Sequence, residues 1–330
     1  MKKSFFAGMM LLAAVMACPT SAKTTYHNIT ADTDTTKIPT VYFVRQITPE
    51  NLIKVAKATG REVKGDNVAI KLSTGEAGNP NHLSPDLIKE FVQGVNGTIV
   101  ECNTAYGGKR SSTAEHLQTA KEHGFTAIAP VDIMDADGEV ALPVKKGKWL
   151  KEDLVGKNLM AYDFLVDMSH FKGHPMAGFG GALKNMSIGI ASRDGKGHIH
   201  SAGKVADANS AWSNLPRDNN YFQEAMAEAC EAVIDHFTPE KILYINVANN
   251  LSVDCDCVSR PARAEILDIG IFASTDPIAI DRACVDAVNE APDHGKIHLQ
   301  NRIKQQKGMR ILEYGEELGL GSQAYKLVEL

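Results

Sequence analysis

The chain has 330 residues, of which 44% are hydrophobic and 23% are charged, and its formal net charge is −5. This composition is typical of a globular protein that buries a large core. The only dense basic run spans residues 145–148, so neither the net charge nor its distribution gives the footprint of a nucleic-acid-binding protein. We therefore exclude nucleic acid as a partner.

The first residues have the pattern of an export signal. Two lysines precede an apolar run over 5–17, and the small residues Thr20 and Ala22 have the spacing required for cleavage after Ala22. The run is too short to span a bilayer comfortably, and no later segment approaches about 20 apolar residues. The sequence predicts a signal peptide over 1–22, an exported, periplasmic protein, and no integral membrane segment in the mature chain.

Two further features of the N-terminal region bear on localisation. Residues 15–18 resemble a bacterial lipobox, in which Cys18 would be lipidated and would anchor the protein to a membrane surface. Pro19, directly after this cysteine, makes lipidation the second interpretation. Residues 23–40 are rich in Thr, Asp and Lys, and this composition predicts a polar tether.

From residue 41 onward, apolar β-branched runs alternate with helical patterns. Helix start signals stand at Thr48-Pro49, at Ser84-Pro85-Asp86, in a capping box from Ser112 to Glu115, and at Thr275-Asp276-Pro277. The predicted strands span 41–45, 68–72, 98–102, 127–131, 158–169, 241–249 and 269–274. This alternation predicts an α/β fold over 41–330, a single elaborated domain with a mostly parallel sheet and helices on both faces.

Polar loops follow four of these strands directly. In parallel sheets, the loops that leave the carboxyl ends of the strands form the ligand crevice. We therefore expect the loops after residues 72, 102, 168 and 249 to gather at one edge. Lys71, Glu76 and Asn103, which stand at the starts of these loops, are predicted ligand contacts.

The segment from His170 to His200 holds four histidines around a glycine-rich stretch. His170 and His174 are four residues apart, but a glycine and a proline argue against a helix, so we expect a loop that turns back on itself. His198 and His200 alternate, and in an extended segment they would point to the same side. These four imidazoles are candidate metal ligands. Solvated or backbone-bonded histidines are the structural alternative.

Cys255 and Cys257 stand in the sequence Asp-Cys-Asp-Cys just past a predicted strand. A disulfide between cysteines one residue apart is expected to be strained, so we predict two thiolates that bind Zn²⁺ or iron together with the histidines. An idle reduced pair is the alternative. An iron–sulfur cubane needs four thiolates, so a cluster fits only if it is shared between subunits or uses histidine ligands.

The glycine-rich stretch also suggests an anion site. Gly180 and Gly181 permit close backbone approach, and residues 182–185 are expected to open a helix whose N-terminal amides favour an anion. Lys172 and Lys184 are the predicted catalytic residues, with Arg193 and Lys196 nearby and Asn185 as a further contact. The structural alternative is a tight helix–sheet contact that requires glycine.

Several of these motifs together carry a family resemblance. The chain resembles the bacterial family of uncharacterised iron–sulfur center proteins, the domain of unknown function 362, from about residue 41 to the C-terminus. Many relatives have a ferredoxin-like insert after the segment that matches 198–201, but residues 202–222 here contain no cysteine. The matching segments are 71–79, 103–110, 169–185, 195–201, 254–257 and 268–281.

Two functional hypotheses follow. The first is an exported metal-dependent enzyme of redox or lyase type, in which the His and Cys pairs hold one metal and a lysine polarises a small anionic substrate. The second is a non-catalytic periplasmic protein that binds a metal or a small anion. A vestigial site in a chain that has lost the ferredoxin insert is a third alternative, and the oligomeric state is left open.

Overall fold

The computed structural model describes residues 22–31 and 33–330. Cys18 and all but the last residue of the predicted signal peptide therefore lie outside the described residues. No helix in the described part of the chain is both long enough and apolar enough to cross a membrane.

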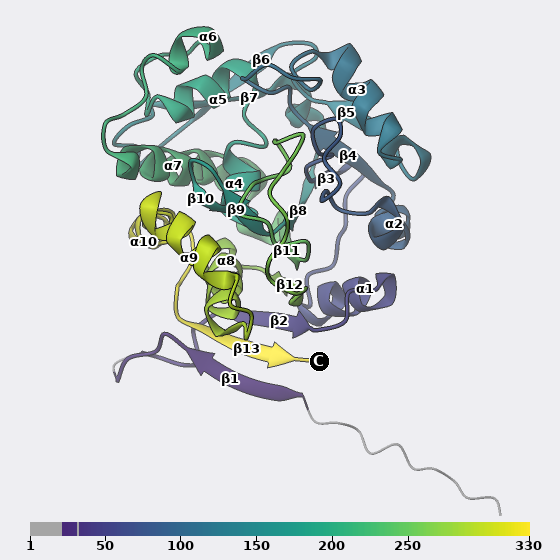
Figure 1. Cartoon of the computed structure of the whole chain (residues 1–330), viewed down its shortest axis with the longest axis vertical. Coiled ribbons are helices and arrows are strands. Elements are labelled where there is room, and N and C mark those ends of the chain that lie inside the picture. The colour runs from purple at the N-terminus through teal and green to yellow at the C-terminus, as the bar shows by residue number, and fades with distance from the viewer. Residues whose placement is uncertain (1–21, 32) are drawn as a thin grey trace, which may run out of the picture.

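The described residues form a nine-stranded sheet in the order β1-β13-β2-β12-β11-β8-β3-β4-β5 (Figure 1). The run from β11 to β5 is entirely parallel, whereas β12 pairs antiparallel with both of its neighbours. The mostly parallel sheet is thus confirmed. Its strands are β1 (Lys23–His27), β2 (Thr40–Val44), β3 (Val68–Lys71), β4 (Gly97–Glu101), β5 (Val131–Ile133), β8 (Phe164–His170), β11 (Ile242–Ala248), β12 (Gly270–Ser274) and β13 (Tyr325–Glu329).

Helices cover both faces of the sheet and create two apolar cores. In β3, Val68 and Ile70 face the core under α1 and α2, whereas Ala69 faces the core under α4, α7, α8 and α10. Strands buried on both faces read as continuous apolar runs, which is why the sequence revealed them. The helices are α1 (Pro49–Ala58), α2 (Pro85–Gly94), α3 (Thr113–Glu122), α4 (Ala182–Ser187), α5 (Arg193–His200), α6 (Ala208–Ala211), α7 (Asn219–Phe237), α8 (Pro277–Glu290), α9 (Lys296–Gln305) and α10 (Arg310–Leu318).

Short elements complete the fold at the top of the view in Figure 1 and in front of the sheet. Two hairpins stand outside the main sheet, one formed by β6 (Glu139–Pro143) and β7 (Glu152–Gly156) and one by β9 (Lys172–His174) and β10 (Gly178–Gly180). The 3-10 helices are η1 (Phe125–Ala127), η2 (Lys157–Ala161) and η3 (Pro239–Lys241).

The structure corrects three of the predicted segments. The strand predicted at 127–131 is mostly a turn, because β5 begins only at Val131, and the strand predicted from residue 158 begins at Phe164 after the turn of η2. Residues 23–27, expected to be part of a polar tether, form β1, which pairs antiparallel with β13 (Figure 1). The strand is polar because it lies at the edge of the sheet, and its partner is about 300 residues away.

Candidate anion site beside a cysteine pair

Four loops meet at the carboxyl edge of the sheet and enclose a cavity of about 100 Å³. They follow β3, β4, β8 and β11, which run parallel to one another, and this common direction brings their ends together. The residues at the cavity wall include Lys71, Glu101, Ser169 and the pair Cys255–Cys257. The predicted convergence of the loops is therefore observed.

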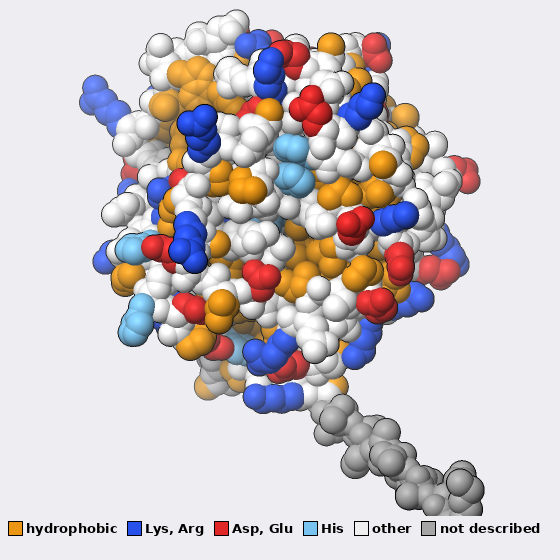
Figure 2. Space-filling model, turned by 45° about the vertical axis from the view of Figure 1, so that its right-hand side comes forward, with side chains coloured by type: hydrophobic (Ala, Val, Ile, Leu, Met, Phe, Trp, Pro, Cys, Tyr) orange, Lys and Arg blue, Asp and Glu red, His pale blue; other side chains and the backbone are white. Residues whose placement is uncertain are grey.

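The cavity wall is rich in cations. Among the described residues, five cationic side chains line it but only two carboxylates do, those of Glu101 and Asp256. On the outer face shown in Figure 2, in contrast, positive and negative side chains are interspersed. The excess positive charge is thus concentrated inside, where low-dielectric walls strengthen its field. The five cations are Lys71, Arg110, Lys172, Lys184 and Lys196.

Two of these cations share one buried carboxylate. The Nζ atom of Lys71 lies 3.4 Å from Glu101 Oε2, and Arg110 Nη1 donates to Glu101 Oε1 at 3.2 Å. Burial alone would raise the pKa of Glu101, but Lys71 and neighbouring donors hold it well below its usual value. Lys71 also donates to Asn185 Oδ1 at 3.1 Å. Both predicted contacts are therefore engaged in a network within the protein.

A second carboxylate, Asp256, pairs with His170 and Lys172. Its Oδ1 lies 2.8 Å from His170 Nδ1, and its Oδ2 lies 2.9 Å from Lys172 Nζ. Burial would raise the pKa of Asp256, and these two partners lower it below its usual range. His170 Nε2 faces the carbonyl oxygen of Asn249 at 2.7 Å. Because both ring nitrogens of His170 face acceptors, neither is free for a metal, which corrects the prediction for this residue.

Lys184 is the exception among the cavity cations. Its Nζ atom has no hydrogen-bond or ion-pair partner among residues 22–31 and 33–330. Burial, and then the charges of Lys172 and Lys71, lower the pKa of Lys184 to about 7. The cavity therefore holds an amine that is close to half protonated at neutral pH.

The N-terminus of α4 binds an anion, but the anion is the chain's own Asp281. The backbone N–H groups of Ala182 and Leu183 donate to its carboxylate at 2.7 and 3.0 Å. A Cβ atom at Gly181 would come within 2.2 Å of Asp281 Oδ1, so glycine is required there. This corrects the expectation that these amides receive a ligand. Gly180 and Gly181 both line the cavity.

Two other predicted contacts lie outside the cavity wall that the described residues form. The side chain of Asn103 donates to Thr113 Oγ1 at 3.0 Å. Glu76 accepts the backbone N–H of Lys109 at 2.8 Å, and its Oε2 lies 3.7 Å from Arg110 Nε. Both residues organise the loop after β4. Glu76 lies beside Arg110 and Asn103 holds Thr113, and neither lines the cavity, which corrects the prediction for them.

The hairpin of β9 and β10 brings His174 to the cysteine pair. It forms the predicted reversal of the chain, and Gly173 lies directly against the backbone of Val253, where a Cβ atom would approach the carbonyl oxygen to 2.4 Å. The loop that carries Cys255 and Cys257 can therefore pack on the hairpin.

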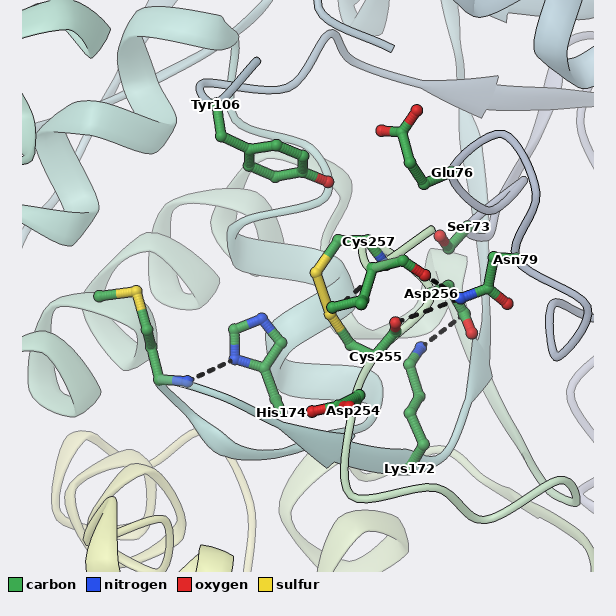
Figure 3. Close-up of a disulfide and its surroundings, with 12 residues drawn as sticks. Ser73, Glu76, Asn79, Tyr106, Lys172, His174, Asp254, Cys255, Asp256 and Cys257 are labelled. Carbon is green, nitrogen blue, oxygen red and sulfur yellow. Dashed lines mark hydrogen bonds and ion pairs between the residues drawn. A yellow bond between two sulfur atoms is a disulfide. The ribbon is translucent and has the colours of Figure 1, made fainter. Parts of the chain in front are cut away.

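Cys255 and Cys257 form a disulfide at the cavity wall (Figure 3). This corrects the expectation of two free thiolates. The ligand atoms of His174 and the two cysteines all lie within 4.8 Å of one another. His174 Nδ1 accepts the backbone N–H groups of Met176 and Ala177 at 3.2 and 2.9 Å, so the proton of the neutral ring lies on Nε2.

The remaining two histidines lie on α5, not on an extended segment. Ser192 caps this helix by accepting the N–H of Gly195 at 2.9 Å. His198 bonds a backbone carbonyl in the following turn and does not line the cavity formed by the described residues. His200 does line it and stacks on Phe222 at 4.5 Å, and burial lowers its pKa to about 3. His198 and His200, predicted to act as a pair, therefore differ: His200 lies at the cavity and His198 does not.

Residues 68–286 match the sequence model of a protein family that is described as "Domain of unknown function (DUF362)". The chain belongs to the DUF362 family. Two solved structures are similar to this DUF362 protein: the lactate racemase apoprotein from Thermoanaerobacterium thermosaccharolyticum (16% identity, TM-score 0.37, 62% of this chain and 50% of that one) and a protein from Thermotoga maritima (11% identity, TM-score 0.44, 73% and 59%). The chain thus spans between half and three-fifths of their lengths. The comparison with curated proteins gave no match.

The site of this DUF362 protein fits a single metal ion better than a cluster. Cys102, Cys230 and Cys284 are buried and stand outside the group formed by His174 and the cysteine pair. A cluster held by four cysteine thiolates therefore does not fit the described residues. Three ligand atoms within 4.8 Å are close enough for one ion once the two sulfur atoms, now joined in a disulfide, move apart to the roughly 3.5–3.8 Å between neighbouring ligands of tetrahedral zinc. The disulfide would first have to be reduced, and the Nε2 proton of His174 would have to move to Nδ1, which would break the hydrogen bonds from Met176 and Ala177.

The sequence interpretation missed the residues that give the cavity its charge pattern. Glu101 and Arg110 were not predicted, although Glu101 ends a buried strand and Arg110 lies in the loop that follows it. The sequence feature that could have identified Glu101 is a charged residue at the end of an otherwise apolar strand. The role of Asp256, which holds Lys172 and His170, depends on a contact across 86 residues of sequence.

Proposed function

We propose that this DUF362 protein binds a small anion, such as a carboxylate or phosphate compound, in the cavity beside α4, and that Lys184 exchanges a proton with it. The observation that carries the proposal is an unpaired, largely buried ammonium group in a cavity where cations outnumber carboxylates. A buried charge without a partner is costly, so an anion that reaches Lys184 is stabilised there.

The other four cavity cations already have partners. Lys71 and Arg110 share Glu101, Lys172 is paired with Asp256, and Lys196 Nζ donates to a backbone carbonyl at 2.6 Å. These groups supply a fixed positive field, whereas Lys184 supplies the contact that is still available. The arrangement therefore favours a bound anion over a bound cation.

An amine with a pKa near 7 suits acid–base or nucleophilic chemistry. Its neutral form abstracts a proton or attacks a carbonyl carbon, and its charged form returns the proton. Lys172 is paired with Asp256, so its role is to supply positive charge beside the substrate. This division supports a lyase-type enzyme. A non-catalytic anion-binding protein is the alternative, which predicts binding without turnover.

The proposal is tested by calorimetric titration of the purified, air-oxidised protein. Sulfate and oxalate are expected to bind, whereas a neutral analogue such as oxamide is not. Lys184→Met should weaken oxalate binding at pH 7 about tenfold, since it removes a charge-assisted contact. Lys89→Met, on the exposed face of α2, is the matched control and should bind like the wild type. Equal affinity in the Lys184 variant would refute the proposal.

A metal site is the second candidate, supported by the closeness of His174, Cys255 and Cys257. In the reduced protein, two thiolates and one imidazole would hold Zn²⁺ or iron at the rim of the cavity, where the metal would polarise a bound substrate. After anaerobic purification with a reductant, elemental analysis should find about one equivalent of a first-row transition metal.

Matched variants make this metal prediction specific. Cys255→Ser and His174→Ala should each lose most of the metal, whereas His236→Ala, an exposed histidine at the end of α7, should retain it. Metal contents that do not differ between His174→Ala and His236→Ala would exclude the site. Thiolate charge-transfer bands in the absorption spectrum would distinguish iron from zinc.

We also propose that the protein is exported, because residues 1–22 have the pattern of a cleaved signal. N-terminal sequencing of the periplasmic protein should begin at Lys23. A lipid-modified Cys18 at the new N-terminus would indicate membrane anchoring instead.

A further inference from the structure

We propose that the Cys255–Cys257 disulfide is a redox-active pair that exchanges with a small anionic thiol bound in the cavity. The inference rests on the anion cavity of the proposed function and adds to it a class of substrate and a reaction. Both cysteines line the cavity, and the same wall carries Lys184 and Arg110. A thiol that bears a carboxylate would place its charge at these cations and its sulfur at the disulfide.

The two sulfur atoms differ in their surroundings. Cys255 is only 3% exposed, whereas Cys257 is half-buried and is the more accessible of the two. The backbone N–H of Cys257 points to Cys255 Sγ at 3.4 Å. An incoming thiolate therefore reaches Cys257, and the negative charge that develops on the departing Cys255 sulfur is stabilised by this amide.

The two acidic residues of the motif do not repel an incoming anion. Asp256, which stands between the cysteines, is paired with Lys172 (Figure 3) and bonded to His170. Asp254 Oδ1 lies 3.6 Å from Arg302 Nη1. Because both carboxylates are paired within the protein, the field at the disulfide is dominated by the remaining cations of the wall.

The exchange balances in two steps. A thiolate RS⁻ attacks Cys257 Sγ, the Cys255–Cys257 bond breaks, and a mixed disulfide forms with Cys257 while Cys255 leaves as a thiolate. A second RS⁻ attacks the sulfur of the bound R group, which releases RSSR and the Cys257 thiolate. Two thiols are oxidised, the protein disulfide gains two electrons, and the protons of the two RSH molecules end on the two cysteines.

The test compares thiols of different charge on the native, air-oxidised protein. 3-Mercaptopropionate (anionic), 2-mercaptoethanol (neutral) and cysteamine (cationic) are added at low ionic strength, and opening of the disulfide is followed by alkylation and mass spectrometry. Each rate is divided by the rate of the same thiol with a neutral small-molecule disulfide, which corrects for thiol reactivity. The corrected rate of the anionic thiol should exceed that of cysteamine at least about tenfold, and 0.5 M salt should reduce this ratio.

Lysine variants distinguish electrostatic steering of the thiol from the simple accessibility of the disulfide. Lys184→Met should slow the anionic thiol at least about fivefold more than it slows 2-mercaptoethanol, whose attacking thiolate carries one negative charge fewer, and Lys89→Met should alter neither rate. Equal corrected rates for the three thiols, or a disulfide that none of them opens, would overturn the inference. Alkylation of Cys255 and Cys257 in the air-oxidised, denatured protein, in addition to the free Cys102, Cys230 and Cys284, would overturn it as well. If oxalate binds but the thiols do not discriminate, the redox inference fails and the proposed anion site stands.

Discussion

Replacing Glu101 by glutamine is expected to destabilise the protein by about 3–5 kcal/mol, because it leaves Lys71 and Arg110 without their shared counter-charge inside the protein. The amide oxygen can still accept the hydrogen bond from Thr74, whose backbone nitrogen lies 2.6 Å from Oε1, but the amide NH2 group then faces Lys71 Nζ, so the variant loses the charge and adds a contact between two donors. In thermal unfolding followed by circular dichroism, Tm should fall by at least about 6 °C.

A surface ion pair supplies the control for this prediction. Glu115→Gln on α3 removes the partner of Lys109, whose Nζ lies 2.6 Å from Glu115 Oε1, but both side chains are about half exposed. Exposed pairs contribute about 0–1 kcal/mol, so Tm should hardly change. If both variants lost the same small amount, Glu101 would not be the counter-ion that organises the cavity wall.

The second prediction concerns the pH dependence of oxalate binding. The groups that face Lys184 are Lys172 on β9, Lys71 on β3, Arg110 and Asp256, and their net positive charge joins burial in holding the pKa of Lys184 near 7 in the empty protein. A bound anion raises that pKa, so binding takes up a proton. Affinity should therefore be highest below pH 7 and should fall as pH rises through 7, up to about 90-fold between pH 6 and pH 9.

Calorimetry in buffers of different ionisation enthalpy measures this proton uptake directly. Oxalate is fully ionised above pH 6, so its own titration does not contribute. The Lys184→Met variant should show a flat profile over the same range, because it lacks the titrating amine. A wild-type profile that stays flat would mean that Lys184 is not at the bound anion.

The sequence predicted most of the sheet because its strands are buried on both faces and read as continuous apolar runs. It did not predict β1 or the shift of β5, since short edge strands lack that signal. For the site, it identified the lysines, the cysteine pair and the loops that converge. It could not predict that Asp281 fills the N-terminus of α4, because the two lie 98 residues apart and only the folded chain brings them together.

The histidines show the same limit. His170 ends β8 and His174 ends β9, yet one is held by Asp256 and the other accepts backbone amides. Their spacing in the sequence alone predicted the same role, metal binding, for both histidines. The structure separates them because the hydrogen-bond partners of each ring come from different loops.

The pairing of β1 with β13 has a consequence for biogenesis. Because β13 lies between β1 and β2, the lower edge of the sheet in Figure 1 cannot close until residues 325–329 have been synthesised. Without β13, β1 would lose the strand with which it pairs among the described residues, and β2 would become an exposed edge able to pair with other chains.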